Sequence, residues 1–323
     1  MKIFKFGGAS VKDAQGFRNV VDIIRRHATT PTLVVVSALG KTTNRLEELA
    51  TAFFEGNAEK AGELFAAVRE GHRAILHELM PDDHAVFSVE TEKLFGRLEH
   101  YLQQEPSDNF DFEYDQIVSF GELFSTRMLS AYLEKLHVSH EWLDARRLVR
   151  TDNHYREGAV DWAKTERKIQ KHLQEHYPNG VDRLLLTQGF IAGTPEKFSI
   201  TLGREGSDYS AAIFAHALHA ESVTIWKDVE GLLNADPKFI PDAVRLERIQ
   251  SDDVAASVPD FLRVSVAPEE QVDHHDFPEV EGCHLRVRLV VQELIEPVVV
   301  RLHMPAVLLE LVEAQGQTCD RLG

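Results

Sequence analysis

Five short segments combine glycine with charged or hydroxyl side chains, and several of them follow directly after a strand-like run. The first is KFGGASV, residues 5–11, in which Lys5 stands just before Gly7 and Gly8. Adjacent glycines let backbone N–H groups approach an anion, and the start of a following helix adds about half a positive charge. A lysine in this place can reach a phosphoryl group. The alternative is an ordinary turn with a solvated lysine, because the segment matches neither GxxxxGK[ST] nor GxGxxG.

The second and third segments are SALGKTTN, residues 37–44, and SFGEL, residues 119–123. The hydroxyl-rich second segment suits a ligand, and Thr43 is equally suited to cap a helix. Glycine inside a helix costs about 1 kcal/mol relative to alanine. Close approach of the backbone to a ligand, with Glu122 accepting from an ammonium group, would explain that glycine. A solvated surface glutamate is the alternative.

The fourth segment, TLGREGSDYSAA, places Arg204, Ser207 and Asp208 at the start of a predicted helix. The guanidinium fork of an arginine suits a carboxylate, and we expect Ser207 to cap the helix.

The fifth segment, WKDVEG followed by ADPK, offers Asp228 and Lys238 for contacts to a nucleotide, although Asp236 and Pro237 also suit a simple turn. Ligands of open α/β sheets bind at the carboxyl ends of the parallel strands, so we expect these segments to converge.

Short apolar runs alternate with helix-period runs over the first 250 residues, a pattern that predicts repeated βαβ units. Strands are predicted at residues 1–6, 32–37, 137–143, 183–187 and 222–226, with a small hairpin at 198–201. Helices are predicted at residues 13–27, 112–136, 162–176 and 207–219, and a charged helical pattern from 43 to 104 is broken at Pro81.

The composition narrows the class of protein. The chain has 323 residues, is 43% hydrophobic and carries a net charge of −17, which argues against a nucleic-acid partner. No apolar run approaches the roughly 20 residues of a membrane helix. The first residues lack the apolar core of a signal peptide, so we expect a cytoplasmic protein. Cys283 and Cys319 are too few for a disulfide scaffold or a cysteine metal cage.

Taken in order, these segments resemble those of the aspartate kinases, within the amino-acid kinase superfamily. KFGGASV is similar to the family's KFGG[ST]SV, and TLGREGSDYSAA is similar to TLGRGGSDY(T/S)A. LDAR at 143–146, with Thr151 and Asp152 after it, resembles the family's DAR…TD, and IWKDVEG…ADPK resembles its W(T/K)DVxG…DPR. The resemblance covers about residues 1–250.

This resemblance implies a three-layer αβα sandwich with a mostly parallel central sheet. It also implies transfer of the γ-phosphoryl group of ATP to the side-chain carboxylate of L-aspartate, giving 4-phospho-L-aspartate. That reaction is the first step toward the aspartate-derived amino acids lysine, threonine and methionine. The implied cofactors are ATP and Mg²⁺, with no metal ligand predicted from the protein, and a homodimer is one possible assembly.

The resemblance also assigns roles to residues at the matching positions. The catalytic residues would be Lys5 and Asp208. The amino acid would be held by Thr43, Glu122, Arg204 and Ser207. Phosphate and nucleotide would be contacted by Gly7, Gly8, Ser10, Ser37, Asp228 and Lys238.

The sequence departs from the family pattern in three single residues and in its last quarter. Ala9 replaces a hydroxyl residue, Glu205 replaces a glycine and Lys238 replaces an arginine. Residues 251–323 contain no Lys, Tyr, Asn or Trp and do not resemble the regulatory ACT domains of the family. We therefore predict a catalytic domain over 1–250 and an atypical tail over 251–323, either out of frame or diverged. A diverged tail would keep strands at 285–291 and 297–302.

Two alternatives to an active aspartate kinase stay open at this point. One is a catalytically impaired remnant that binds nucleotide or a partner without turnover. The other is a kinase of the same superfamily that acts on glutamate, acetylglutamate or UMP.

Overall fold

The computed structural model describes residues 1–28, 31–83, 88–227, 264–267, 285–291 and 298–302. The chain divides into two compact units, Met1–Leu218 and His219–Gly323, and each is described by itself. The predicted domain boundary near residue 250 lies outside the described residues and stays a prediction.

A parallel sheet forms the centre of the first unit. Its strands are β1 (Lys2–Phe6), β2 (Thr32–Val36), β3 (His140–Trp142) and β4 (Leu184–Gln188), in the order β3-β4-β2-β1. Every neighbouring pair is parallel, with Lys5 opposite Val35 and Val36 opposite Gln188. β2 and β4 are buried along their whole length, as expected for a parallel sheet covered on both faces. The predicted strands are confirmed, although β3 is shorter than expected.

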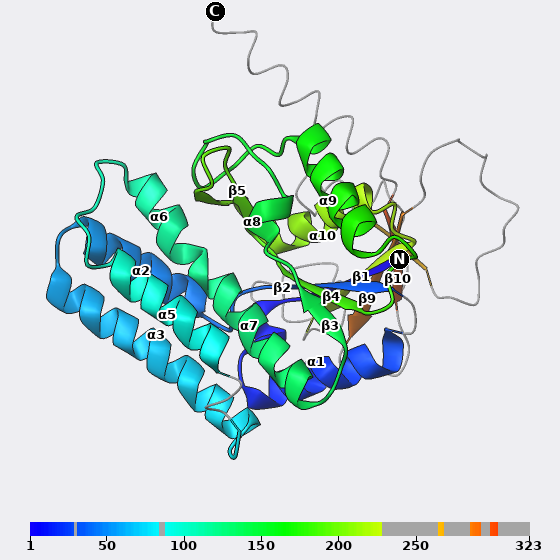
Figure 1. The fold of residues 1–323 in the computed structure, drawn as a ribbon, viewed down its shortest axis with the longest axis horizontal. Helices are drawn as coiled ribbons and strands as arrows, with labels where there is room; N and C mark the ends of the chain where they lie inside the picture. The colour runs from blue at the N-terminus through cyan, green and yellow to red at the C-terminus, as the bar shows by residue number, and fades with distance from the viewer. Residues whose placement is uncertain (29–30, 84–87, 228–263, 268–284, 292–297, 303–323) are drawn as a thin grey trace, which may run out of the picture. The chain divides into compact units, whose positions relative to one another are not determined.

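Helices cover both faces of this sheet. They are α1 (Ala14–His27), α2 (Thr42–Phe54), α3 (Ala58–Leu79), α5 (Val89–Tyr101), α6 (Phe110–Val118), α7 (Phe120–Lys135), α8 (Ala145–Leu148), α9 (Trp162–His176) and α10 (Gly206–Ala217), with a short 3-10 helix, η1, at Gly8–Val11. Figure 1 shows α8, α9 and α10 over one face of the sheet and α1 and α7 under the other. This arrangement confirms the predicted three-layer αβα sandwich with a parallel central sheet.

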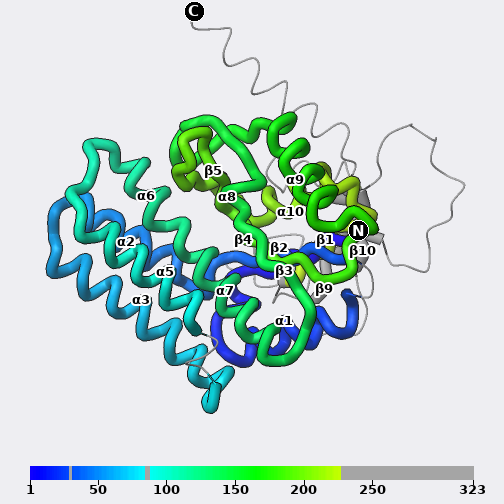
Figure 2. The backbone as a smooth tube through the Cα atoms, in the orientation of Figure 1, coloured from blue at the N-terminus to red at the C-terminus, as the bar shows by residue number. Residues whose placement is uncertain are grey.

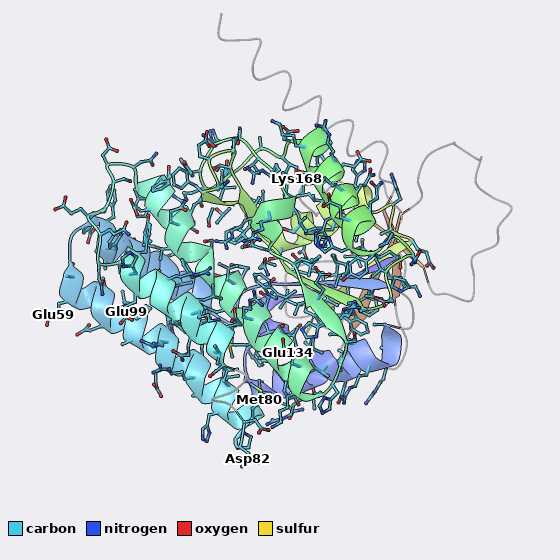
Figure 3. All side chains as sticks on the ribbon, in the orientation of Figure 1. Glu59, Met80, Asp82, Glu99, Glu134 and Lys168 are labelled. Carbon is cyan, nitrogen blue, oxygen red and sulfur yellow. The ribbon has the colours of Figure 1, made fainter. Side chains whose placement is uncertain are left out.

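The helices α2, α3, α5 and α6 extend the first unit beyond the sheet, as Figure 2 shows. Exposed charged residues lie on them, among them Glu59 of α3 and Glu99 of α5, which Figure 3 labels. Among the described residues, no helix is long and apolar enough to cross a membrane.

The prediction of one helix over 112–136 is wrong, because Ser119 separates α6 from α7. The Ser119 hydroxyl donates to the carbonyl of Gln116 at 3.2 Å, so it competes with the backbone for helical hydrogen bonds. The backbone of Ser119 stays in the helical region, so the chain bends there and enters α7 directly. The other predicted helices are confirmed, with α9 matching residue for residue.

A small antiparallel hairpin, β5 (Ile191–Gly193) and β6 (Ser199–Thr201), confirms the hairpin predicted at residues 198–201. The second unit holds β7 (Ser222–Lys227), β8 (Val264–Ala267), β9 (Leu285–Val291) and β10 (Val298–Leu302), in the order β7-β9-β10-β8. β9 pairs in parallel with β7, and β10 is antiparallel to β8 and β9. The strands predicted at 285–291 and 297–302 are therefore present, whereas β8 was not predicted.

A histidine lies in the aromatic core between α3, α5 and α7. His72 is 2% exposed, and its ring centre lies 5.7 Å from Phe95 and 5.3 Å from Phe124. Its Nδ1 is 2.6 Å from the carbonyl oxygen of Val68. Burial lowers the pKa of His72 from 6.5 to about 4, an effect that the Val68 hydrogen bond opposes and the charge of Arg45 reinforces. The folded protein therefore holds this ring neutral at pH values where the unfolded chain protonates it.

We predict that His72 makes the fold acid-sensitive. Its contribution is fully present above pH 6.5 and is lost as the pH falls toward about 4, at a cost of about 3 kcal/mol. Urea unfolding measured across this range should show a smaller loss of unfolding free energy for His72→Gln than for the unsubstituted chain. His77→Gln, on the exposed side of the same helix, should keep the original pH dependence. Equal slopes for all three proteins would contradict the assignment.

Candidate active site

A pocket of about 260 Å³ lies in the first unit where β1 and β2 end and α10 begins. Predicted site residues from distant segments line it together: Lys5, Gly8, Ser37, Thr43, Glu122, Ser207 and Asp208. The remaining lining residues are Ala38, Gly40, Phe190, Gly203, Glu205 and Gly206. The carboxyl ends of the parallel strands therefore form the candidate site.

A buried ion pair lies in the wall of the pocket. The Lys5 ammonium is 2.6 Å from a carboxylate oxygen of Asp208, and the two side chains are 6% and 3% exposed. Lys5 comes from buried strand β1, and Asp208 comes from the first turn of α10. Each charge would be costly to bury without the other, because neither has bulk water around it.

The loops after β1 and β2 approach each other closely at Gly8. A Cβ atom added to Gly8 would lie 2.6 Å from the carbonyl oxygen of Ala38, so no side chain fits there. The amide of Gly40 donates to the carbonyl of Gly8 at 3.0 Å, and the amide of Ser37 donates to Phe6 at 3.1 Å. These bonds fix the two loops as one wall of the pocket.

Glu122 contributes a buried carboxyl group. Its Oε1 accepts from the amide of Ala38 at 3.1 Å, whereas its Oε2 has no hydrogen-bond partner within the described part of the chain. Burial raises the pKa of Glu122 to about 8, and the Ala38 hydrogen bond only partly offsets this effect. A buried carboxyl group with one unused oxygen is suited to receive a cationic group of a ligand.

Gly121 packs closely against neighbouring protein segments. A Cβ atom there would lie 3.0 Å from the Cβ of Ala38 and 3.3 Å from Leu46. The close approach inferred for this glycine is therefore to the loop after β2 and to α2.

The start of α10 forms the opposite wall. Glu205 is the residue before the helix and has a left-handed backbone with φ of 55°, which disfavours a non-glycine residue. Gly206 allows close contact with Phe190, because an added Cβ would lie 2.6 Å from the ring. The prediction that Ser207 caps the helix is wrong, since the helix begins one residue earlier and Ser207 lies inside it. The helix dipole at this end favours an anion.

Three predicted site residues that the structure describes do not line the pocket. Gly7 precedes η1, with Lys5 Nζ 3.9 Å from where its Cβ would be. Ser10 is buried, and its hydroxyl has no hydrogen-bond partner among the described residues. Arg204 is exposed in the turn before α10. Asp228 and Lys238 lie outside the described residues. The roles predicted for these five positions stay predictions.

Six lining residues were not predicted to be site residues: Ala38, Gly40, Phe190, Gly203, Glu205 and Gly206. Five of them lie inside the segments quoted above, whereas Phe190 lies in none of those segments. Several act through the backbone. For Glu205 the sequence did hold one sign of a special position, because the family pattern has glycine there. The left-handed backbone of Glu205 explains that glycine.

Chemically, the pocket offers an anion subsite beside a cation subsite. Lys5, the amides around Gly8 and the start of α10 favour an anion. Glu122 favours an ammonium group. Among the described residues there is no cluster of three or more side chains that could hold a metal ion by itself.

Comparison with known proteins gives the family. The model of the "Amino acid kinase family" matches residues 1–267. Lysine-sensitive aspartokinase 3 of Escherichia coli is 34% identical over 247 residues, which are 76% of this chain and 53% of that protein. The chloroplastic bifunctional aspartokinase/homoserine dehydrogenase 2 of Arabidopsis thaliana is 32% identical over 76% of this chain and 27% of its own length.

A crystal structure of E. coli aspartokinase III in complex with aspartate and ADP has a TM-score of 0.73 and 29% identity, covering 91% of this chain and 62% of that one. The chain thus spans about half or less of the length of these curated relatives. The family match covers most of the sequence and includes the whole candidate site. The chain belongs to the amino acid kinase family.

Proposed function

We propose that the protein transfers the γ-phosphoryl group of ATP to the side-chain carboxylate of L-aspartate, forming 4-phospho-L-aspartate. The observation that carries this proposal is one pocket that holds the Lys5–Asp208 pair, the start of α10 and the unused oxygen of Glu122. The names of the relatives agree with it, since they are aspartokinases and one solved relative contains aspartate and ADP.

Phosphoryl transfer needs positioning and charge stabilisation more than a covalent nucleophile. In the proposed complex Lys5 neutralises charge on the moving phosphoryl group, and the amides near Gly8 and Ser207 bind its oxygens. The acceptor carboxylate is already ionised at neutral pH, so no general base is required.

The amino acid would be held on the Glu122 side of the pocket. We propose that Glu122 binds its ammonium group, while Thr43 and Arg204 bind its carboxylates. Arg204 is close in sequence to the pocket but exposed, so this role requires its side chain to turn inward.

Nucleotide contacts by Asp228 and Lys238 are part of the proposal and rest on the sequence alone. Magnesium would arrive on the phosphates of ATP and neutralise their charge.

We predict that the purified chain, with Mg-ATP and L-aspartate, forms an acyl phosphate that hydroxylamine traps as a hydroxamate. L-Glutamate should give much less product. Lys5→Ala should lower the rate at least about 100-fold, because it removes charge stabilisation of the transition state. Lys12→Ala, an exposed lysine in the next turn, should retain the rate.

Circular dichroism of each variant tests whether it is folded. No hydroxamate from folded, unsubstituted chain would overturn the proposal and favour the remnant that binds without turnover.

The pKa of Glu122 predicts the pH dependence of substrate capture. Glu122 must be ionised to bind an ammonium group, and its pKa of about 8 keeps it mostly protonated at neutral pH. The kcat/KM for L-aspartate should therefore rise up to about tenfold per pH unit between about pH 6 and 8. Glu122→Gln should lower kcat/KM and flatten this slope. Thr43→Val changes the same pocket without removing a titrating group, so a flattened slope there would count against Glu122.

Glu205 places a negative charge where the proposed phosphates bind, on a backbone that favours glycine. Removing about 1 kcal/mol of repulsion should lower the KM for ATP about fivefold in both Glu205→Gln and Glu205→Gly. Only Glu205→Gly should also relieve the left-handed backbone and raise the melting temperature. An unchanged KM in both variants would show that the carboxylate does not act on the nucleotide.

A further inference from the structure

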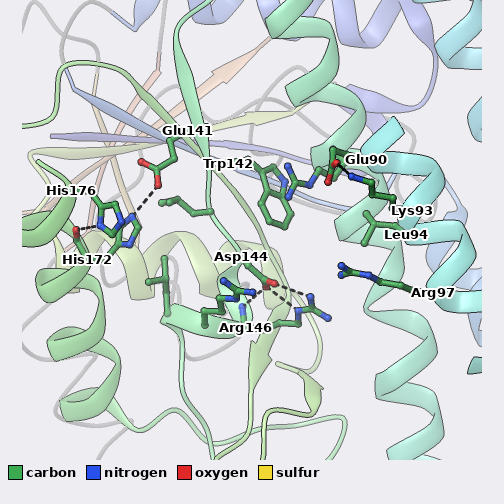
Figure 4. A pocket seen from close by; sticks show the side chains of 14 residues that line it. Glu90, Lys93, Leu94, Arg97, Glu141, Trp142, Asp144, Arg146, His172 and His176 are labelled. Carbon is green, nitrogen blue, oxygen red and sulfur yellow. Dashed lines mark hydrogen bonds and ion pairs between the residues drawn. The ribbon is translucent and has the colours of Figure 1, made fainter. Parts of the chain in front are cut away.

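A second and larger pocket, of about 460 Å³, lies beside edge strand β3 in the first unit. Figure 4 shows side chains from β3, α5, α8 and α9 around it, and Arg127 of α7 also lines it. It shares no lining residue with the candidate active site. Its charged and aromatic lining residues are Glu90, Lys93, Arg97, Arg127, Glu141, Trp142, Asp144, Arg146, Arg147, His172 and His176.

Each acidic side chain of this pocket already has a partner. Glu90 pairs with Lys93 at 2.5 Å, and Asp144 pairs with Arg146 at 2.8 Å. Glu141 accepts from the hydroxyl of Tyr177 and lies 3.3 Å from Nε2 of His172. The negative charges of the pocket are therefore engaged within the protein.

Three guanidinium groups of the pocket have no acidic partner in the part of the chain that the structure describes. Within the described residues, the guanidinium groups of Arg97, Arg127 and Arg147 form neither an ion pair nor a hydrogen bond. They come from α5, α7 and α8, so three separate elements bring them to one cavity. The unengaged charge of the pocket is thus positive.

Arg127 is held in place before any ligand arrives. Its guanidinium carbon lies 3.4 Å from the centre of the Trp142 ring, and the indole of Trp142 donates to the hydroxyl of Thr126 at 3.0 Å. Burial lowers the pKa of Arg127, and the nearby charge of Arg97 adds to this effect, while Glu90 and Asp144 oppose it. A partly desolvated cation fixed on an aromatic face loses little freedom when it binds an anion.

We propose that this pocket is a binding site for a small molecule that carries a doubly negative oxyanion group, either a phosphate monoester or a dicarboxylate. The planar guanidinium fork matches phosphate and carboxylate oxygens in pairs, and three forks suit two or more negative charges. The volume and concave shape of the pocket fit a metabolite-sized ligand. The site is independent of the proposed kinase reaction.

Trp142 provides a local readout, because it is one of three tryptophans and lies in the pocket. We would titrate the full chain with inorganic phosphate or with succinate, keep ionic strength constant with chloride, and follow tryptophan fluorescence. At least one of the two anions should give a saturable change that chloride does not give. Trp142→Phe should remove the change, which separates this pocket from anion binding at the candidate active site. Binding of phosphate would identify the ligand as a phosphate monoester, and binding of succinate would identify it as a dicarboxylate.

Arg97 and Arg147 are exposed and unpaired within the described residues, so their substitution should leave the fold intact. The double variant Arg97→Gln/Arg147→Gln should raise the midpoint of the titration at least tenfold, because it removes two charge-assisted contacts. Arg167→Gln, an exposed arginine of α9 outside the lining, should leave the midpoint unchanged. A midpoint that the double variant does not move, or no saturable change with either anion, would overturn the proposal.

Discussion

The buried ion pair between Lys5 and Asp208 is the constraint on which the rest of the site depends. It joins the end of β1 to the first turn of α10 at 2.6 Å, out of contact with bulk water. Buried pairs of this kind seldom add stability over apolar packing, so the geometry they enforce is their main consequence. The ion pair can form because two glycines allow neighbouring backbone segments to approach closely. A Cβ on Gly189 would lie 2.6 Å from that of Ser207, and one on Gly8 would meet the backbone of Ala38. The glycines let the helix and the strand ends meet closely enough for the pair to form.

Helix α7 connects this site with the cationic pocket beside β3, since it carries both Glu122 and Arg127. Between them, the hydroxyl of Thr126 donates to the backbone carbonyl of Glu122 at 2.7 Å and accepts from the Trp142 indole at 3.0 Å. The side-chain amide of Gln188, at the end of β4, donates to the same hydroxyl at 2.9 Å. A ligand that moved Trp142 would therefore act on hydrogen bonds that hold the turn bearing Glu122. The two pockets share a scaffold even though they share no lining residue.

Much of the fold and part of the site could be predicted from the sequence, for identifiable reasons. Buried parallel strands such as β2 leave continuous apolar runs, and glycine and hydroxyl residues directly after them mark ligand-binding loops. The bend at Ser119 could not be predicted, because it depends on a side-chain hydrogen bond inside a helix-forming sequence. The packing role of Gly121 could not be predicted either, since its neighbours lie about 80 residues away along the chain. The same is true of the cationic pocket, whose arginines stand in unrelated segments and meet only in the folded chain.

The charges of the candidate active site restrict how it can hold phosphates. The positive charge of Lys5 is offset by Asp208, and Glu122 is mostly protonated at neutral pH because its pKa is about 8. Glu205 adds a negative charge at the mouth. The pocket walls are therefore not strongly cationic, so backbone amides and the α10 dipole have to provide most of the attraction for an anion. A triphosphate carries far more charge than these groups can neutralise. A nucleotide would thus have to bring its own divalent cation, and an arginine such as Arg204 would have to turn inward to complete the site.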